Sequence, residues 1–164
     1  MIPVIAAVFA TMPIVAVPPH QCLSTIVLCI GVYKMKLGAT LYIKNSNEAV
    51  ELYMKAFGLT LGYYEKFPDG TFMHAALFRD GNEVFAVSES QNDAFVNIML
   101  NSSIKESRPT MSYGLNFDSE EEVKRAYDML SRDGIVLLPL GTLSWSSCCA
   151  EVVDKYGVYW YITV

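Results

Sequence analysis

The chain has 164 residues, a formal net charge of −5, a pI near 5.0 and no basic cluster longer than Lys124-Arg125. A chain of this length can bury a core without disulfides, and its acidic balance excludes the basic surface on which nucleic-acid binding depends. The cysteines, at Cys22, Cys29 and the pair Cys148-Cys149, match neither a zinc C-x-x-C pattern nor a disulfide framework. We therefore expect reduced thiols and a cytoplasmic protein.

Residues 1–34 form an apolar segment interrupted by Pro3, Pro13, Pro18 and Pro19. The segment has no basic start of the kind that a secretory signal needs, and its apolar runs are shorter than the about 20 residues of a membrane helix. We interpret it as an N-terminal extension outside the domain, which then begins near Met35. A membrane anchor is the alternative, and we expect no membrane partner.

The first predicted module covers residues 35–90. It starts with a strand over residues 39–44, followed by a helix whose apolar residues recur at helical spacing and which ends at Gly58. Asn45-x-x-Glu48 has the form of a capping box at the start of this helix. Three strands follow, over residues 59–67, 71–79 and 83–88, and the turn sequences between them contain Gly70 and Gly81. The order is β-α-β-β-β.

The same order returns after a polar linker over residues 91–110, in which residues 95–100 could form a helical turn. The second module covers residues 111–164: a strand over 111–117, a helix that starts at the capping box Ser119-x-x-Glu122 and stops at Gly134, and strands over 135–140, 143–153 and 158–164. Asn45 and Ser119 are 74 positions apart, as are Tyr53 and Tyr127. This spacing indicates an internal duplication.

Several short motifs resemble the vicinal oxygen chelate superfamily, which includes glyoxalase I, bleomycin and fosfomycin resistance proteins and extradiol dioxygenases. The pattern is closest to its PhnB-like branch and covers residues 37–164. The motifs are Tyr53-x-x-x-Phe57-Gly58, Met73-His74-Ala75, Trp145, Asp154-x-x-Gly157 and Trp160. The resemblance implies an α+β fold in which two tandem β-α-β-β-β modules form an open, curved sheet cup with helices on the convex face. It also implies a homodimer with two-fold symmetry.

Metal-binding members of the superfamily carry His, Glu or Gln at four positions in the cup. Carried over to this sequence, those positions fall on Gly38, Phe85, Ser112 and Tyr161, none of which is a good ligand for a catalytic metal. We therefore predict no metal site and no cofactor, with a divalent metal held by other residues as the alternative.

Four residues are candidates for contact with a ligand in the cup: His74, Trp145, Tyr159 and Tyr161. Strand alternation separates Tyr159 and Tyr161 from Trp160, which we expect to pack against the helix. A tyrosine wall with hydroxyl tips suits a small organic ligand, although plain packing would also explain these tyrosines. Alternation also predicts Phe72 and His74 on one face of their strand, where His74 could instead be satisfied by a neighbour.

The remaining polar clusters have structural explanations. Glu120-Glu121-Glu122 suits a helix N-terminus, and Asp154 suits a turn. Cys148 and Cys149 alternate across a strand, with no histidine nearby in sequence to activate a thiolate. No catalytic residue is identified, and whether the chain is an enzyme stays open.

Three functions follow from these observations. The first is a PhnB-like protein of the glyoxalase and bleomycin-resistance type that binds a small organic ligand in the cup without a catalytic metal. The second is a metal-dependent lyase or dioxygenase of the same superfamily. The third is a non-catalytic dimeric scaffold whose own aromatic residues fill the cup.

Overall fold

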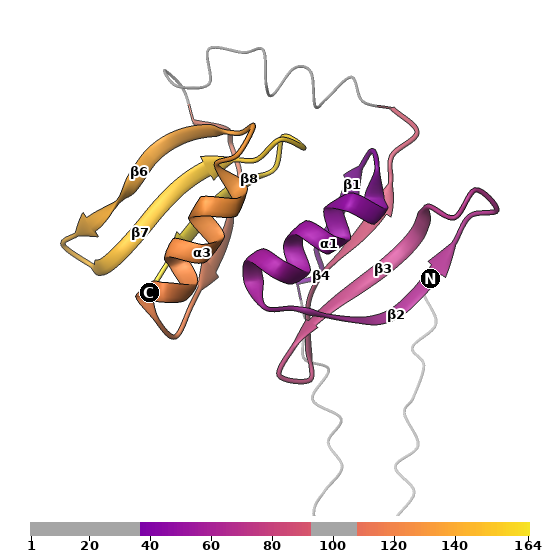
Figure 1. The fold of residues 1–164 in the computed structure, drawn as a ribbon, viewed down its shortest axis with the longest axis horizontal. Coiled ribbons are helices and arrows are strands. Elements are labelled where there is room, and N and C mark those ends of the chain that lie inside the picture. The colour runs from indigo at the N-terminus through magenta and orange to yellow at the C-terminus, as the bar shows by residue number, and fades with distance from the viewer. Residues whose placement is uncertain (1–36, 93–107) are drawn as a thin grey trace, which may run out of the picture. The chain divides into compact units, whose positions relative to one another are not determined.

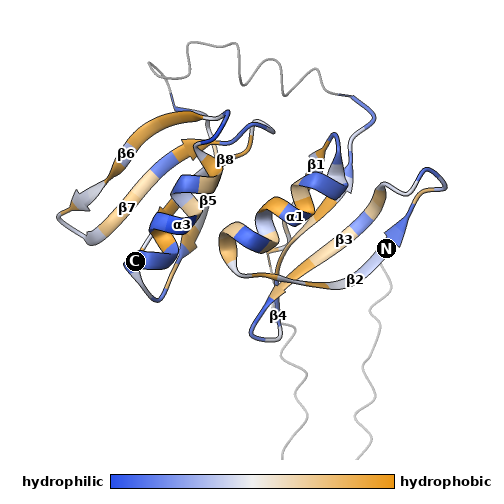
Figure 2. Cartoon of the chain, viewed as in Figure 1, coloured by the Kyte–Doolittle hydropathy of each residue, from blue (hydrophilic) through white to orange (hydrophobic). Residues whose placement is uncertain are grey.

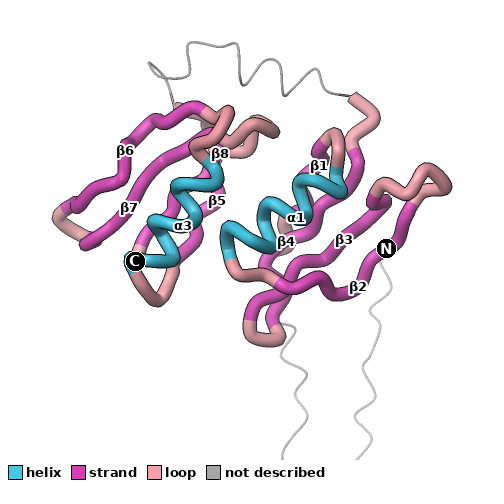
Figure 3. The backbone as a smooth tube through the Cα atoms, viewed as in Figure 1, coloured by secondary structure: helices cyan, strands magenta, loops and turns pink. Residues whose placement is uncertain are grey.

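The computed structural model describes residues 37–92 and 108–164. The segment 1–34 and the helical turn predicted at 95–100 lie outside the described residues. In order, the elements are β1 (Thr40–Ile43), α1 (Ser46–Phe57), β2 (Thr60–Lys66), β3 (Phe72–Arg79), β4 (Asn82–Glu89), β5 (Tyr113–Asn116), α3 (Glu120–Leu130), β6 (Ile135–Leu143), β7 (Ser146–Val153) and β8 (Tyr159–Thr163) (Figures 1 and 3).

The two modules have the same sheet topology. One four-stranded sheet has the order β1-β4-β3-β2 and the other the order β5-β8-β7-β6. In each sheet the first and last strands of the module pair in parallel, with Leu41 opposite Val87 and Leu115 opposite Ile162. The remaining pairs are antiparallel. The structure thus confirms the duplication and the α+β class, as two open sheets.

Each helix lies across one face of its own sheet (Figure 1). The buried side chains of α1 include Ala49, Tyr53 and Phe57, and those of α3 are Val123, Ala126 and Leu130. Figure 2 shows hydrophobic residues along β3 and β7 and hydrophilic residues in the hairpin turns. In residues 37–92 and 108–164, no helix is long and apolar enough to cross a membrane. We call the opposite face of each sheet its helix-free face.

The start of α1 differs from the predicted capping box. Asn45 has a left-handed backbone, with φ of 65°, and its side chain makes no capping hydrogen bond. The cap comes from β4: the Glu89 carboxylate accepts from the backbone N–H of Asn45 at 3.0 Å and of Ser46 at 2.7 Å. A carboxylate placed there by tertiary structure satisfies the free amides of the first turn and complements the helix dipole.

The second helix begins as predicted but ends earlier. The Ser119 hydroxyl accepts from Glu122 N–H at 3.4 Å, and the Glu122 carboxylate accepts from Asp118 N–H instead of closing the box on Ser119. The C-cap residue is Ser131. Gly134 has a different role from a helix stop, because a Cβ there would lie 2.6 Å from the carbonyl oxygens of Leu130 and Val153.

Strand β3 contains a register shift that alters the predicted alternation. Lys66 pairs with Phe72, and Glu65 pairs with His74, so that Met73 is an additional residue in β3. Phe72 joins the core with Ala75 and Leu77, and its N–H donates to the Ser46 hydroxyl at 2.9 Å. The prediction that Phe72 and His74 share a face was therefore wrong, because a bulge moves one residue to the other side.

The two modules share one hydrophobic core. Trp160 of β8 is fully buried, and its ring lies 4.9 Å from that of Phe57 and 5.3 Å from that of Tyr53. This confirms that Trp160 packs against helices, but the nearest aromatic partners belong to the other module. The second module therefore depends on α1 for part of its packing.

A buried carboxylate lies at the centre of this junction. Asp154 is 0% exposed and accepts hydrogen bonds at 2.8 Å from both Tyr53 Oη and Trp160 Nε1. It also accepts from the N–H groups of Tyr156 and Val158 at 2.9 and 3.0 Å. Burial raises the pKa of Asp154, although the hydrogen bonds oppose that shift. The predicted turn residue is thus also the polar centre of the contact between the modules.

Candidate functional site

Two of the four predicted ligand-binding residues meet on the helix-free face of the second module. Trp145 lies in the turn between β6 and β7 and is 72% exposed, yet its Nε1–H donates to Tyr161 Oη at 2.9 Å. An indole with this exposure has little packing to hold it, so the hydrogen bond fixes its orientation. Because the Tyr161 oxygen accepts from Trp145, its own hydrogen is free to donate to another molecule. We call these two residues the Trp145–Tyr161 pair.

Tyr159, the third candidate, is buried next to a charged pair. Tyr161 is paired in register with Glu151, and Tyr159 with Val153. The Glu151 carboxylate accepts from Arg108 Nε at 2.6 Å. Burial, and then hydrogen bonding to Glu151, raise the pKa of Tyr159, so its hydroxyl stays protonated at neutral pH. Its ring packs against Val153, with Ile135 and Leu137 beside it.

His74, the fourth candidate, lies on β3 of the other sheet. It is half-buried, and its ring centroid is 6.2 Å from that of Tyr63. Tyr63 Oη donates to the Glu65 carboxylate, which sits opposite His74 in the register. His74 therefore has an aromatic and an acidic neighbour on the same strand, β2, but it is not part of the Trp145–Tyr161 pair.

Two of the four positions at which metal-binding relatives carry ligands, Phe85 and Tyr161, lie on different kinds of sheet face. Phe85 is a core residue on the face that α1 covers, 2% exposed, so the position carried over to it does not face the helix-free side. Tyr161 does lie on that side, where it binds Trp145. Within residues 37–92 and 108–164, no three His, Cys, Asp or Glu side chains gather as a metal site would require.

Cys148 and Cys149 point to opposite sides of β7, and both are buried free thiols. Cys148 packs in the core that the helices cover. Burial raises the pKa of the Cys148 thiol, which favours the unreactive protonated form. These two side chains therefore offer neither a nucleophile nor a two-thiol chelate.

Sequence reasoning missed the network around Asp154 and a set of pocket residues. The Asp-x-x-Gly motif pointed to Asp154 as a turn residue, but its partner Tyr53 is 101 positions away. The pocket lies beside β1 and β5 and includes Tyr159, together with Tyr42 and Tyr113. No local motif marks these two tyrosines, because they line one space only after the modules pack.

No protein-family model matches the sequence, and no curated protein matches it. Several solved structures are similar to this chain. A PhnB protein from Bacillus cereus, which its description proposes to be a 3-demethylubiquinone-9 3-methyltransferase, is 26% identical with a TM-score of 0.61. The match covers 79% of this chain and 98% of that one. Protein PA1353 from Pseudomonas aeruginosa is 25% identical with a TM-score of 0.58, over 79% of this chain and 97% of that one.

A third neighbour supports the fold alone. It is a glyoxylase/bleomycin resistance protein/dioxygenase domain from Frankia sp. EAN1pec, 11% identical with a TM-score of 0.54, over 80% of this chain and 97% of that one. All three matches span almost the full length of the neighbour and fit the repeated β-α-β-β-β topology. The two matches at 25% and 26% identity, together with the motifs at Tyr53, Asp154 and Trp160, make the chain similar to PhnB-like proteins and are consistent with the vicinal oxygen chelate superfamily.

Proposed function

We propose that the protein binds a small organic molecule on the helix-free face of its second module, without a catalytic metal. The observation that carries the proposal is the Trp145–Tyr161 pair, an exposed indole that a hydrogen bond holds in place. A flat apolar ring can stack on the indole, and an acceptor atom on the ligand can meet the free hydroxyl hydrogen of Tyr161.

The neighbouring residues support the same chemistry. Glu151 lies opposite Tyr161 on this face, so the surface continues with a carboxylate that Arg108 already neutralises, and the buried ring of Tyr159 supports it from the same strand as Tyr161. Such a surface would orient a ligand through a few polar contacts and would not hold it by strong charge attraction. His74, with Tyr63 and Glu65, offers a second polar group on the helix-free face of the first module.

We do not extend the methyltransferase description of the Bacillus cereus neighbour to this chain. A cofactor with phosphates or a sulfonium centre is commonly held at a glycine-rich strand-to-helix turn. Here the corresponding turns are Lys44-Asn45 before α1 and Phe117-Asp118-Ser119 before α3, and neither contains glycine.

The experiment is a thermal-shift screen of the full chain against small aromatic compounds with a carbonyl or hydroxyl group, with and without EDTA. Compounds that bind at the Trp145–Tyr161 pair should raise the melting temperature equally under both conditions, and for these compounds Trp145→Leu should remove the shift. Leu37→Ala, which also deletes an exposed apolar side chain, is the matched control. Stoichiometric Ni, Mn, Fe or Zn in the purified protein, or stabilisation that EDTA abolishes, would favour the metal-dependent alternative. A screen without any stabilising compound would favour the scaffold.

We further propose that the protein is a homodimer. Strand β2 is an edge strand, and Tyr63 and Tyr64 on it and Met73 on the adjacent β3 are large apolar side chains exposed to solvent. An edge strand of this kind is usually covered by a partner. Light scattering should give twice the chain mass of 18.3 kDa, and Tyr64→Lys should shift it toward the monomer. A monomeric mass for the unmodified chain would refute the dimer.

We also propose a cytoplasmic location, supported by the free thiols of Cys148 and Cys149. Fractionation of cells that express the full chain should recover it in the soluble fraction. Recovery with membranes, or only outside the cytoplasm, would contradict this.

A further inference from the structure

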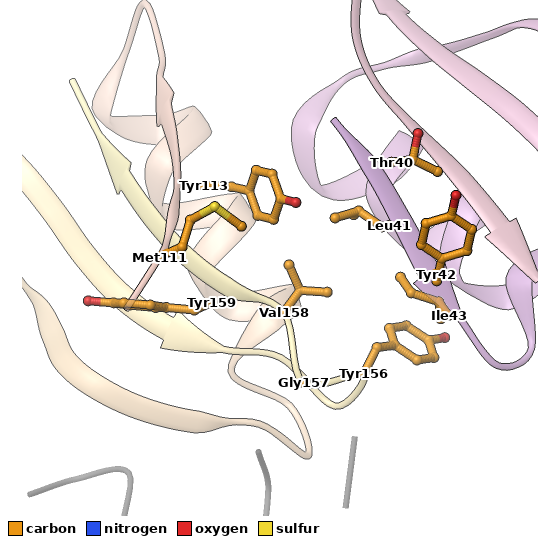
Figure 4. Close-up of a pocket in the computed structure, with 10 residues that line it drawn as sticks. All are labelled: Thr40, Leu41, Tyr42, Ile43, Met111, Tyr113, Tyr156, Gly157, Val158 and Tyr159. Atoms are coloured by element: carbon orange, nitrogen blue, oxygen red, sulfur yellow. The ribbon is translucent and has the colours of Figure 1, made fainter. Parts of the chain in front are cut away.

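A pocket of about 260 Å³ lies between β1 of the first module and the β5 and β8 strands of the second (Figure 4). Its aromatic lining comes from Tyr42, Tyr113, Tyr156 and Tyr159, and Met111, which precedes β5, also lines it. Neither Trp145 nor Tyr161 lines it, so it is separate from the pair proposed above to bind a ligand. Of the residues predicted from sequence to contact a ligand, it contains Tyr159 alone.

The chemistry of the lining restricts what could bind. The described residues that form the pocket are aromatic, aliphatic or small, and none carries a charge. An ionised ligand would lose hydration on entry without gaining a counter-ion, which makes its binding costly. A neutral molecule with an apolar body avoids that cost and buries its surface against tyrosine rings and methyl groups.

The hydroxyl of Tyr113 is placed to orient such a molecule. The ring of Tyr113 packs against that of Trp160, with centroids 5.6 Å apart, so its position is fixed by the core. In Figure 4 its hydroxyl extends from β5 into the space between the strands, toward Leu41 on β1. Among the described residues, Tyr113 Oη has no hydrogen-bond partner. A rigid and unpartnered hydroxyl in an apolar pocket is a ready contact for one polar atom of a ligand.

We infer that this pocket binds a neutral small molecule with a flat apolar body and one hydrogen-bonding group, which meets Tyr113 Oη. The inference does not depend on the Trp145–Tyr161 pair, because neither residue of the pair lines the pocket; Tyr159 is the one described residue that borders both sites. The lining favours an aromatic body, because tyrosine rings on β1 (Tyr42) and on β5 (Tyr113) can stack with such a body or contact its edge.

Calorimetric titration of the full chain with 2-naphthol tests the inference, with 2-naphthoate as a probe of the same shape that carries a charge. We expect saturable binding of 2-naphthol and at least tenfold weaker binding of 2-naphthoate. Tyr113→Phe should weaken 2-naphthol binding by about 2- to 12-fold, the loss expected for one hydrogen bond. Its urea midpoint should not change, because the hydroxyl has no partner to lose.

Two further variants complete the design. Tyr127→Phe removes a hydroxyl from α3, outside the pocket, and should leave 2-naphthol affinity unchanged. Trp145→Leu should retain the binding, which separates this pocket from the helix-free face. The inference is overturned by an absence of 2-naphthol binding, by equal binding of 2-naphthoate, by an unchanged affinity in Tyr113→Phe, or by loss of binding in Trp145→Leu.

Discussion

Removal of the Asp154 carboxylate should destabilise the whole fold, because this side chain joins the two modules. In Asp154→Ala, the hydroxyl of Tyr53 and the indole N–H of Trp160 would both remain buried without an acceptor. A buried donor left unpaired costs about 1–3 kcal/mol, so the free energy of unfolding should fall by about 2–6 kcal/mol. The two turn amides add less, because water can reach a turn more easily.

Asp154→Asn divides this loss into parts. Asn keeps one oxygen for the N–H groups of Tyr156 and Val158, but its amide nitrogen faces Tyr53 and Trp160. The Tyr53 hydroxyl can rotate and accept a hydrogen bond from the amide nitrogen, but the indole N–H of Trp160 can only donate. Trp160 therefore loses its acceptor, and the free energy of unfolding should fall by about 1–3 kcal/mol. Tyr53→Phe removes one hydrogen bond to a charged group and should cost about 1.5–3 kcal/mol.

Urea unfolding, followed by the fluorescence of the buried Trp160, measures these losses. The double variant Tyr53→Phe/Asp154→Asn should lose less than the sum of the single losses, by more than about 0.5 kcal/mol, because the two residues share one hydrogen bond. Additive losses, or an Asp154→Ala variant as stable as the natural chain, would refute the assignment of Asp154 as the polar centre of the junction.

The pH dependence has a defined sign. The pKa of Asp154 is raised in the folded state, so between the ordinary carboxyl value of 3.8 and the raised value the folded state binds more protons than the unfolded state. The free energy of unfolding should therefore decrease as pH rises through that window, and Asp154→Asn should lack this contribution. An opposite slope in the difference between the two proteins would show that the pKa is lowered instead.

Three further predictions concern the fold. Glu89→Ala should lower the free energy of unfolding by about 0.5–2 kcal/mol, the value of a lost helix cap. Glu83→Ala on the same strand should change it little, and equal effects of the two variants in urea unfolding would contradict the capping role of Glu89. Gly134→Ala should lower the free energy of unfolding by more than about 1 kcal/mol, because its Cβ would clash with two backbone carbonyl oxygens. Gly38→Ala, which has open space around it, should be neutral. A Gly134→Ala protein as stable as the natural chain would disprove the close approach of these carbonyls to Gly134. Arg79 on β3 is partly buried and joins the two modules, because it donates to Glu122 on α3 at 2.9 Å and to Phe57 O at 3.4 Å, so Arg79→Ala should lower the free energy of unfolding by about 1–3 kcal/mol. Lys55→Ala, which removes an exposed ion pair with Glu51, should cost under about 0.5 kcal/mol; similar losses in the two variants would argue against a stabilising Arg79–Glu122 contact.

The parts of the fold that local sequence determines were predicted. The periodicity of Ala49, Tyr53 and Phe57, and the turn glycines Gly70 and Gly81, gave the elements and their order. The repeat spacing then predicted the shared topology. These features depend on residues close together in the chain, where helical spacing and turn conformation act directly.

The errors have a common cause in contacts between distant residues. Glu89 replaces the predicted Asn45 cap from 44 positions away. The bulge at Met73 accompanies a hydrogen bond from Phe72 to Ser46, which alternation cannot reveal. Gly134 was expected to stop a helix, but it is required because β7 passes close to it.

The candidate site was predicted only in part for the same reason. Strand alternation placed Tyr161 on the helix-free face, and Trp145 was selected for its position near a turn, but only the folded sheet brings the two into hydrogen-bond contact. The pocket beside Tyr113 forms where the first strands of the two modules approach each other. Its tyrosines are 71 positions apart in the chain, so no sequence pattern connects Tyr42 with Tyr113.

Binding of a small aromatic compound from the screen to EDTA-treated full-length protein, measured by titration with the Trp145→Leu variant as control, tests the central claim most directly. The account predicts saturable binding by the natural chain, unchanged by prior chelation and lost in Trp145→Leu. Binding that requires added metal, or full affinity in Trp145→Leu for every compound that binds, would contradict metal-free ligand binding at the Trp145–Tyr161 pair.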